Sequence, residues 1–227
     1  LASGSIEMKY MTAKEEDILT NQSFINNGVV LDKLFKALIV TPVEYNDLLL
    51  CDKNAVMIAA RILGYGKDYP IKAVNPTTGE EVEHVVDLTQ LPEKEIDWSL
   101  LDKGTNEFTL DLPAAKIPVK LKLLTQRDQS KMDAELKGLA KLKKNAAVST
   151  MMKYVITNID GETDNAKIRK FVDTRLLAID SRAIRKFLIS ITPETSLEIQ
   201  VPDGDSGDNF RTTVSIGLDF FWPDSGL

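Results

Sequence analysis

The chain has 227 residues, of which 43% are hydrophobic and 27% charged, with a formal net charge of −6. These values are ordinary for a globular protein with a sizeable core, and the acidic balance argues against nonspecific nucleic-acid binding. The single cysteine, Cys51, excludes an internal disulfide and a cysteine-rich metal site. No apolar stretch approaches the roughly 20 residues that span a bilayer, and no signal peptide is evident. We therefore expect no membrane attachment.

The N-terminal region is predicted to be helical. Thr12 and Glu15 have the spacing of a capping box, which predicts a short helix that ends before Gly28. Apolar residues between positions 30 and 40 then keep helical spacing. That second helix must end before Pro42, because the residue before a proline avoids the helical region of backbone space.

A helix followed by a β-hairpin is predicted next. Asp52 is a good N-cap for the helix, and Gly64 is placed as the residue just past its end. Residues 71–74 and 82–88 alternate as two strands, and residues 75–79, Asn-Pro-Thr-Thr-Gly, have the composition of a turn.

The middle of the chain predicts a strand pair and two helices. Apolar residues alternate over 108–112 and 117–123, which indicates two antiparallel strands with one buried face. Thr125 is expected to cap a long polar helix that runs to about Asn145. Apolar residues over 148–159 keep helical spacing and predict a more buried helix.

The C-terminal part repeats the helix-and-hairpin order. A helix capped by Thr163 or Asp164 precedes a second one capped by Asp180, and alternation follows over 197–201 and 210–218. The phrase Asp-Lys-Asn-Ala-Val at 52–56 is written again as Asp-Ser-Arg-Ala-Ile at 180–184. The distance from the aspartate to the first strand residue is similar, 19 residues (52 to 71) and 17 residues (180 to 197). We interpret the two regions as a diverged internal duplication.

Together these elements predict an α+β protein. A helical scaffold carries two related helix-plus-β-hairpin units and a central antiparallel strand pair. We expect three consecutive segments: N-terminal helices, first unit and central strands (1–125), linking helices (126–162), and the second unit (163–227).

The sequence offers no catalytic, cofactor or metal site. His84 lies in a predicted strand without a nucleophile beside it, and Cys51 lacks a second histidine or a redox partner. Gly64 and Gly66 precede a lysine without P-loop spacing. The acidic run at 203–208 lacks the glutamate that a calcium loop needs at its twelfth position. An enzyme with Cys51 or His84 in its site remains the rival interpretation.

Two features favour protein docking. Residues 167–186 contain seven Lys and Arg against two Asp, whereas residues 1–100 contain nine against 16 acidic residues. The basic stretch is either a solvated helical face or a docking surface for an acidic partner. Consecutive strand side chains alternate, so the aromatic cluster at 220–222 should turn one face to the core and the other to a partner or another part of the chain. The candidate partner-binding residues are Phe220, Phe221, Trp222, Arg182, Arg185 and Lys186.

An ordered set of short motifs extends from about residue 2 to 224. The motifs are Met-Thr-Ala-Lys-Glu-Glu-Asp-Ile-Leu-Thr at 11–20, Asp-Lys-Asn-Ala at 52–55, Ala-Arg-Ile-Leu-Gly-Tyr-Gly at 60–66, Leu-Leu-Thr at 123–125, Asp-Ser-Arg-Ala-Ile-Arg-Lys at 180–186 and Phe-Phe-Trp-Pro at 220–223. Each motif is weak alone, but the ordered set resembles the baseplate hub protein family of T4-like contractile-tailed bacteriophages.

The resemblance implies a non-enzymatic late phage protein that acts by protein–protein interaction when the central hub of the tail baseplate is built. Its implied partners are other hub or tail proteins, or a second copy of itself, in the host cytoplasm during assembly or in the virion tail. The resemblance also implies that many relatives carry a Cys-x-x-Cys knuckle in each hairpin, which would suit a tetrahedral zinc site. Here Asn75 and Thr78 stand at those positions and the second turn has no cysteine, so no metal is expected. An assembly chaperone absent from the virion, or a nucleic-acid-binding adaptor using residues 167–186, are the alternatives.

Overall fold

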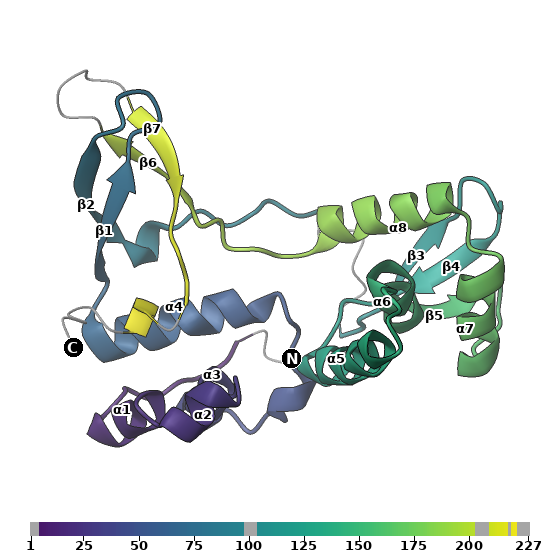
Figure 1. Ribbon diagram of the computed structural model, residues 1–227, viewed down its shortest axis with the longest axis horizontal. Helices are drawn as coiled ribbons and strands as arrows, with labels where there is room; N and C mark the ends of the chain where they lie inside the picture. Colours follow the sequence, from purple (N-terminus) through teal and green to yellow (C-terminus); the bar gives the residue numbers. More distant parts are fainter. Residues whose placement is uncertain (1–4, 98–103, 203–208, 218, 222–227) are drawn as a thin grey trace. The chain divides into compact units, whose positions relative to one another are not determined.

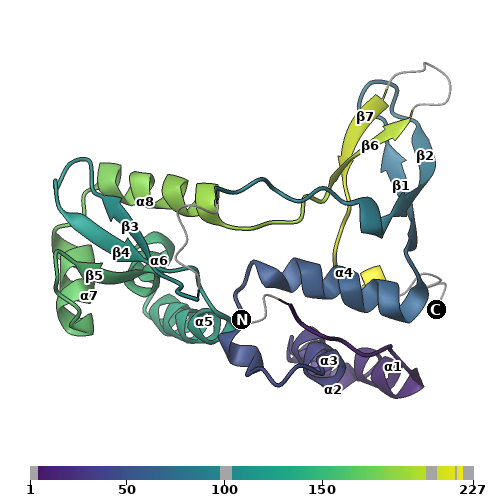
Figure 2. The same cartoon turned by 180° about the vertical axis from the view of Figure 1, so that it is seen from behind.

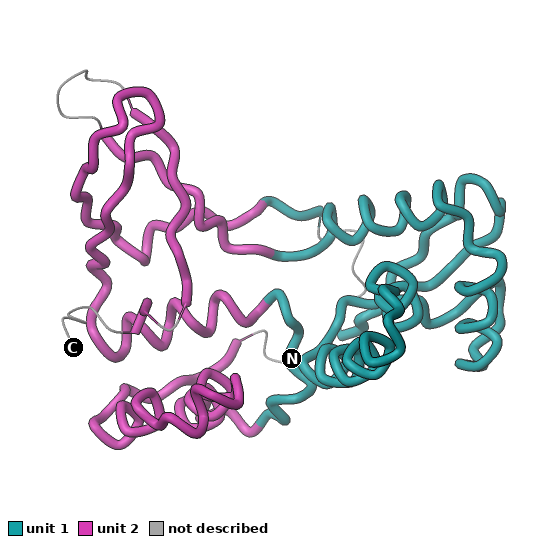
Figure 3. Tube along the Cα trace, viewed as in Figure 1, with its two compact units in different colours: residues 1–2, 43–51, 95–193 teal, residues 3–42, 52–94, 194–227 magenta. Residues whose placement is uncertain are grey.

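The computed structural model describes residues 5–97, 104–202, 209–217 and 219–221. The chain divides into two compact units, each assembled from segments far apart in sequence (Figure 3). Unit 1 contains residues 1–2, 43–51 and 95–193, and unit 2 contains residues 3–42, 52–94 and 194–227. The two compact units therefore do not coincide with the three consecutive segments expected from the sequence, because the polypeptide passes from one unit to the other several times.

Helices and short antiparallel strands are both present, as the predicted α+β class requires (Figure 1). Unit 1 is a three-stranded antiparallel sheet, ordered β3-β4-β5, packed with helices around one apolar cluster that includes Leu121, Met152 and Ile184. Its elements are η1 (Tyr45–Asp47), β3 (Phe108–Asp111), β4 (Pro118–Leu121), α5 (Gln126–Lys141), α6 (Ala147–Val155), β5 (Ile156–Ile159), α7 (Asn165–Thr174) and α8 (Ala178–Ile191).

The predicted central pair is confirmed as β3 and β4, and it gains a third strand. The helix expected over 148–159 ends at Val155, and residues 156–159 pair with β4 as β5 instead. Ile156 and Ile159 are buried in the strand, as they would be in a helix, so apolar spacing could not separate the two. The strand conformation is favoured here because the open edge of β4 offers hydrogen-bond partners to the backbone of residues 156–159, and a further helical turn would leave that edge unpaired.

Helix α5 confirms the Thr125 cap but ends at Lys141, earlier than expected. Asp180, expected as the cap of α8, is instead the third residue of that helix, and Leu177 occupies the cap position. The Asp180 carboxylate is fully buried and accepts hydrogen bonds from the backbone N–H groups of Ala114 (2.7 Å) and Ala115 (3.2 Å). It therefore joins α8 to the turn between β3 and β4.

Unit 2 is built from α1 to α4 and two β-hairpins. The two hairpins pack face to face through Ala73, Val201 and Phe210, and their strands form separate two-stranded antiparallel sheets (Figure 2). The elements are α1 (Ala13–Leu19), α2 (Gln22–Asn26), α3 (Val30–Leu38), α4 (Asp52–Tyr65), β1 (Asp68–Val74), β2 (Glu81–Asp87), η2 (Leu88–Gln90), β6 (Glu198–Pro202), β7 (Asn209–Thr213) and η4 (Asp219–Phe221).

A helix followed by a hairpin therefore occurs twice in the order of elements, but the two copies do not form two similar compact bodies. Helix α4 and hairpin β1–β2 share unit 2, whereas α8 belongs to unit 1 and its hairpin β6–β7 to unit 2. The second hairpin packs against the first because each two-stranded sheet needs a partner surface to bury its apolar face.

Two boundaries of the first copy also shift. Asp52 is the first residue of α4 rather than its cap, and Gly64 lies inside the helix. The helix ends at Tyr65, and Gly66 follows in the left-handed region (φ 86°), with its N–H donating to the Ile62 carbonyl (3.0 Å). A Cβ at Gly64 would stand 3.0 Å from Cε of Met11, a tight contact that the flexible methionine would have to relieve by a small shift.

The single N-terminal helix expected before Gly28 is two helices. The capping box is formed: the Thr12 N–H (3.0 Å) and hydroxyl (2.6 Å) both donate to the Glu15 carboxylate. Asn21 then starts α2 by accepting from the Phe24 N–H (3.1 Å). No helix in the described part of the chain is long and apolar enough to cross a membrane.

Glu15 gives unit 2 a defined pH dependence. Its side chain is 2% exposed, and hydrogen bonds from Thr12 and from Lys9 Nζ (2.9 Å) lower its pKa to about 2. Since the folded pKa lies below the ordinary value of 4.5, this contribution is complete above pH 4.5 and is lost as pH falls towards 2. Glu15→Gln should cost about 1 kcal/mol at pH 7, the typical worth of a helix cap.

Thermal unfolding of both proteins between pH 7 and pH 3 measures this contribution. The melting-temperature difference should shrink as pH falls, whereas Glu7→Gln, at an exposed position, should leave the melting temperature unchanged. A difference that stays constant across the range would show that the Glu15 charge is not the source.

Candidate functional site

The aromatic cluster near the chain end belongs to the core of unit 2. Phe220 and Phe221 are 0% exposed, their rings stand edge to face at 5.6 Å, and Phe220 meets the ring of Tyr69 at 4.9 Å. They lie in the 3-10 turn η4 rather than in a strand, so consecutive side chains need not point to opposite faces. Of the two alternatives that the sequence left open for the outward face, a partner or another part of the chain, the burial of both rings favours the second. Trp222 lies outside the described residues.

The same unit buries an arginine that the sequence does not mark. Arg61 is 1% exposed, and its guanidinium lies 5.1 Å from the ring centre of Tyr65 and 5.6 Å from that of Tyr69. It donates to the Gly66 carbonyl (3.3 Å), and burial lowers its pKa. The ring faces and this carbonyl compensate part of the desolvation of the charge, which identifies Arg61 as a structural residue.

The predicted basic residues of α8 form a surface. Arg182, Arg185 and Lys186 are all exposed, and none of them forms an ion pair with a described residue. Ile179 (59% exposed) and Ile189 (68% exposed) flank them on the same side of the helix. At about 100° per residue, the five side chains fall within roughly a third of the helix circumference. We call these five residues the α8 face.

The rest of the basic stretch is divided: Lys170 and Arg175 are also exposed, whereas Lys167 and Arg169 form ion pairs. Lys167 pairs with Glu162 (2.6 Å) and Arg169 pairs with Glu135, so both are neutralised within unit 1. Residues 167–186 are therefore not one basic patch. Among the described residues, the cations of α8 that form no ion pair lie where the helix also exposes isoleucines.

A polar cavity of about 460 Å³ is the second feature of unit 1. Its lining includes Lys122, Asp128, Lys131, Lys153 and Arg169. Lys122 donates to both Asp128 oxygens (2.7 and 2.8 Å), and Lys153 pairs with an aspartate of α7 (2.7 Å). Burial alone would raise the pKa of Asp128, but the hydrogen bonds from Lys122 and Thr125 lower it overall. Most of the positive charge around this cavity is thus already matched by carboxylates.

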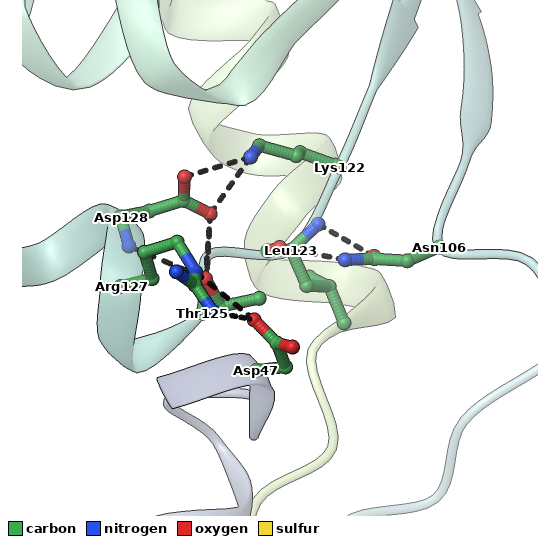
Figure 4. A network of polar contacts seen from close by, with 7 residues as sticks. All are labelled: Asp47, Asn106, Lys122, Leu123, Thr125, Arg127 and Asp128. Carbon is green, nitrogen blue, oxygen red and sulfur yellow. Dashed lines mark hydrogen bonds and ion pairs between the residues drawn. The ribbon is translucent and has the colours of Figure 1, made fainter. Parts of the chain in front are cut away.

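Polar contacts beside this cavity join separate segments of unit 1 (Figure 4). Arg127 donates to Asp47 through Nε (3.0 Å) and a terminal nitrogen (2.8 Å), which connects α5 to η1. The Asn106 amide exchanges two hydrogen bonds with the backbone of Leu123 (2.8 and 2.9 Å). These contacts position chain segments, and we interpret the network as structural.

The two residues weighed for catalysis lie in ordinary surroundings. Cys51 is partly exposed and lines a small apolar cavity of about 170 Å³ with Leu123, Met151 and Leu188. His84 lies on β2 opposite Ile71 and is partly exposed. The described residues contain no group of three or more His, Cys, Asp or Glu side chains that could hold a metal ion.

The first hairpin turn is closed by an amide rather than by a knuckle of cysteines. Asn75 is 4% exposed, and its side-chain oxygen accepts from the N–H groups of Thr77 (2.8 Å) and Thr78 (3.3 Å). Gly79 ends the turn in the left-handed region (φ 77°). The turn therefore obtains its shape from local hydrogen bonds.

Comparison with known proteins identifies no relative: no family, no curated protein and no solved structure matches the chain.

Proposed function

We propose that the chain is a non-enzymatic assembly protein that docks to other proteins through the α8 face. The observation that supports this function is the combination of two exposed isoleucines with Arg182, Arg185 and Lys186, which form no ion pair with a carboxylate of the described residues. Isolated surface cations are usually solvated by water. Exposing apolar side chains beside them costs free energy, which burial against a partner would recover. A surface of this composition is suited to an acidic protein partner, with charge guiding the encounter and the isoleucines adding contact area.

The biological setting that we propose is assembly of the central hub of a contractile phage tail baseplate. This step is supported by the ordered motifs that resemble the baseplate hub family, from residues 11–20 to 220–223. The protein would act in the host cytoplasm, either as a hub component that remains in the virion or as a chaperone that leaves before the tail is complete.

A nucleic-acid-binding role is the weaker candidate. A phosphate backbone would use the three cations of the α8 face but would gain little from exposed isoleucines. The paired state of Lys167 and Arg169 further reduces the charge available to a duplex.

Affinity capture from phage-infected cells tests the proposed function. The tagged chain should recover a hub or tail protein, and Arg182→Glu/Arg185→Glu/Lys186→Glu should reduce that recovery by at least about tenfold, because like charges at an interface are strongly unfavourable. The matched control is Lys137→Glu/Lys141→Glu/Lys144→Glu, which makes the same change of charge at exposed positions of α5 and just beyond it.

The control should recover the partner as the unaltered chain does. Recovery of no tail protein, or equal recovery by both triple variants, would contradict the proposal. Salt-dependent binding to duplex DNA that only the α8 variant loses would support the adaptor instead.

A further inference from the structure

We propose that the α8 face of one copy docks onto the outer face of the β1–β2 hairpin of a second copy, so that the protein associates head to tail with itself. This inference rests on the proposed docking function of α8 and names its partner. The argument has three parts: the composition of the hairpin face, the spacing of the apolar residues, and the distribution of charge.

The outer face of the β1–β2 hairpin is exposed and carries both charged and apolar side chains. Every second residue of each strand points away from the packed hairpin pair, and the exposed ones are Asp68, Pro70, Lys72, Val74, Glu81, Glu83 and Val85. Val74 is 61% exposed and Val85 is 58% exposed. Two valines therefore flank a charged centre, just as two isoleucines flank the charged centre of the α8 face.

The distances between the apolar residues match. Ile179 and Ile189 are ten residues apart, or about 15 Å along a helix that rises 1.5 Å per residue. On the hairpin, Val74 pairs with Glu81 and Val85 pairs with Pro70, so the two valines lie four register positions apart. At about 3.4 Å per residue, with one interstrand spacing to add, they are about 14–15 Å apart. Both isoleucines can therefore contact a valine at the same time.

The charges between the apolar ends are complementary. The α8 face carries three cations, while Glu81 and Glu83 on the hairpin share one cation, Lys72, at 3.2 and 3.5 Å. That sharing leaves net negative charge on the hairpin face. Both bonds are exposed, so exchanging them for contacts with arginine costs little.

Charge is also separated between the two units as wholes. Unit 1 has 18 Lys and Arg against 15 Asp and Glu, a net charge of 3, and unit 2 has 10 against 19, a net charge of −9. Unit 2 of one copy and unit 1 of another should therefore attract each other over a Debye length before contact. Like units of two copies repel, which favours contact between unit 1 and unit 2 over pairing through like units.

The contact joins two different patches, so it is heterologous unless two copies make it reciprocally. Heterologous contacts either close into rings or continue as open chains, whereas symmetric pairing stops at two copies. One helix face on one hairpin is a small interface of the transient class, so association should depend strongly on concentration and salt.

Sedimentation of the purified full chain over a concentration series tests the inference. The average mass should rise above that of one copy with concentration and fall again in high salt. Arg182→Gln/Arg185→Gln/Lys186→Gln removes the cations, and Glu81→Gln/Glu83→Gln removes the hairpin carboxylates. Each should weaken self-association by at least about tenfold, while the neutral control Lys137→Gln/Lys141→Gln/Lys144→Gln should not.

Mixing the two impaired variants identifies the contact. The intact hairpin of the first can meet the intact α8 face of the second, so the mixture should form pairs of one copy each and nothing larger. A mixture that stays at one copy, or an unaltered chain that never exceeds one copy, overturns the inference. If infected-cell capture still recovers a tail protein in that case, the proposed docking function stands without self-association.

Discussion

Replacing Phe220 by alanine is expected to lower the free energy of unfolding of unit 2 by about 3–5 kcal/mol, the range found for buried aromatic residues. Its ring is 0% exposed and stands edge to face with both Tyr69 and Phe221. Removing it deletes the apolar burial and both ring contacts, and it leaves a cavity against α4, which packs with η4. Few single changes in unit 2 should cost more.

Hydrogen exchange followed by mass spectrometry measures this loss, because it reports each unit separately. Amides of α4, β1 and β2 should lose protection in Phe220→Ala, while those of β3, β4 and α6 in unit 1 should change far less. The matched control is Phe24→Ala on α2, where the ring is only partly buried and lies under the Lys33 ammonium (5.7 Å). That control should cost about 1 kcal/mol.

If Phe220→Ala lost partner capture but kept full amide protection, the ring would be a binding residue after all. The burial makes the opposite outcome the expected one. Variants at 220 and 221 should therefore be excluded from any set that is meant to map docking, because unfolding would imitate a lost interface.

Local patterns predict much of this fold. The capping boxes at Thr12 and Thr125, the alternation in β1 to β4 and the stop before Pro42 depend on neighbours in sequence, and the structure has each of them. Strand β5 could not be predicted in this way. Its conformation depends on the free edge of β4, some 40 residues earlier in the chain, which no local window contains.

The candidate site was predicted in part. The exposed cations of α8 were identified from composition, whereas their isolation from carboxylates required the structure, since Lys167 and Arg169 looked equivalent in sequence. Strand geometry left Phe220 facing either a partner or another part of the chain, whereas it lies buried in the turn η4. No sequence pattern marked Arg61 as buried, because a buried arginine differs from an exposed one only in the residues that surround it in the fold.

The repeated phrase illustrates the limit most clearly. Asp52 and Asp180 begin the same sequence pattern, yet Asp52 is a partly exposed first residue of a helix and Asp180 is fully buried. The difference comes from Ala114 and Ala115, whose N–H groups reach Asp180 from a distant turn. An aspartate pattern predicts a hydrogen-bond acceptor near a helix start, but not which donors it will find.

Asp180→Ala should accordingly destabilise unit 1 by about 3 kcal/mol. Two backbone N–H groups in the β3–β4 turn would lose their acceptor, and an unsatisfied buried donor costs about 1–3 kcal/mol. The turn also contains Lys116 with a φ of 57°, a conformation that needs support from its surroundings. Asp180→Asn should cost less, because one amide oxygen can still accept from one of the two N–H groups.

Asp164→Ala is the matched control, since Asp164 is an exposed cap of α7 whose side chain accepts from the Lys167 N–H (2.9 Å). It should cost about 1 kcal/mol. Urea unfolding, combined with hydrogen exchange of the β3 and β4 amides, compares the two alanine variants. If Asp180→Ala and Asp164→Ala had equal effects, Asp180 would act as an ordinary helix-end acceptor. A larger loss centred on the β3–β4 turn would establish Asp180 as the residue that holds α8 to the sheet.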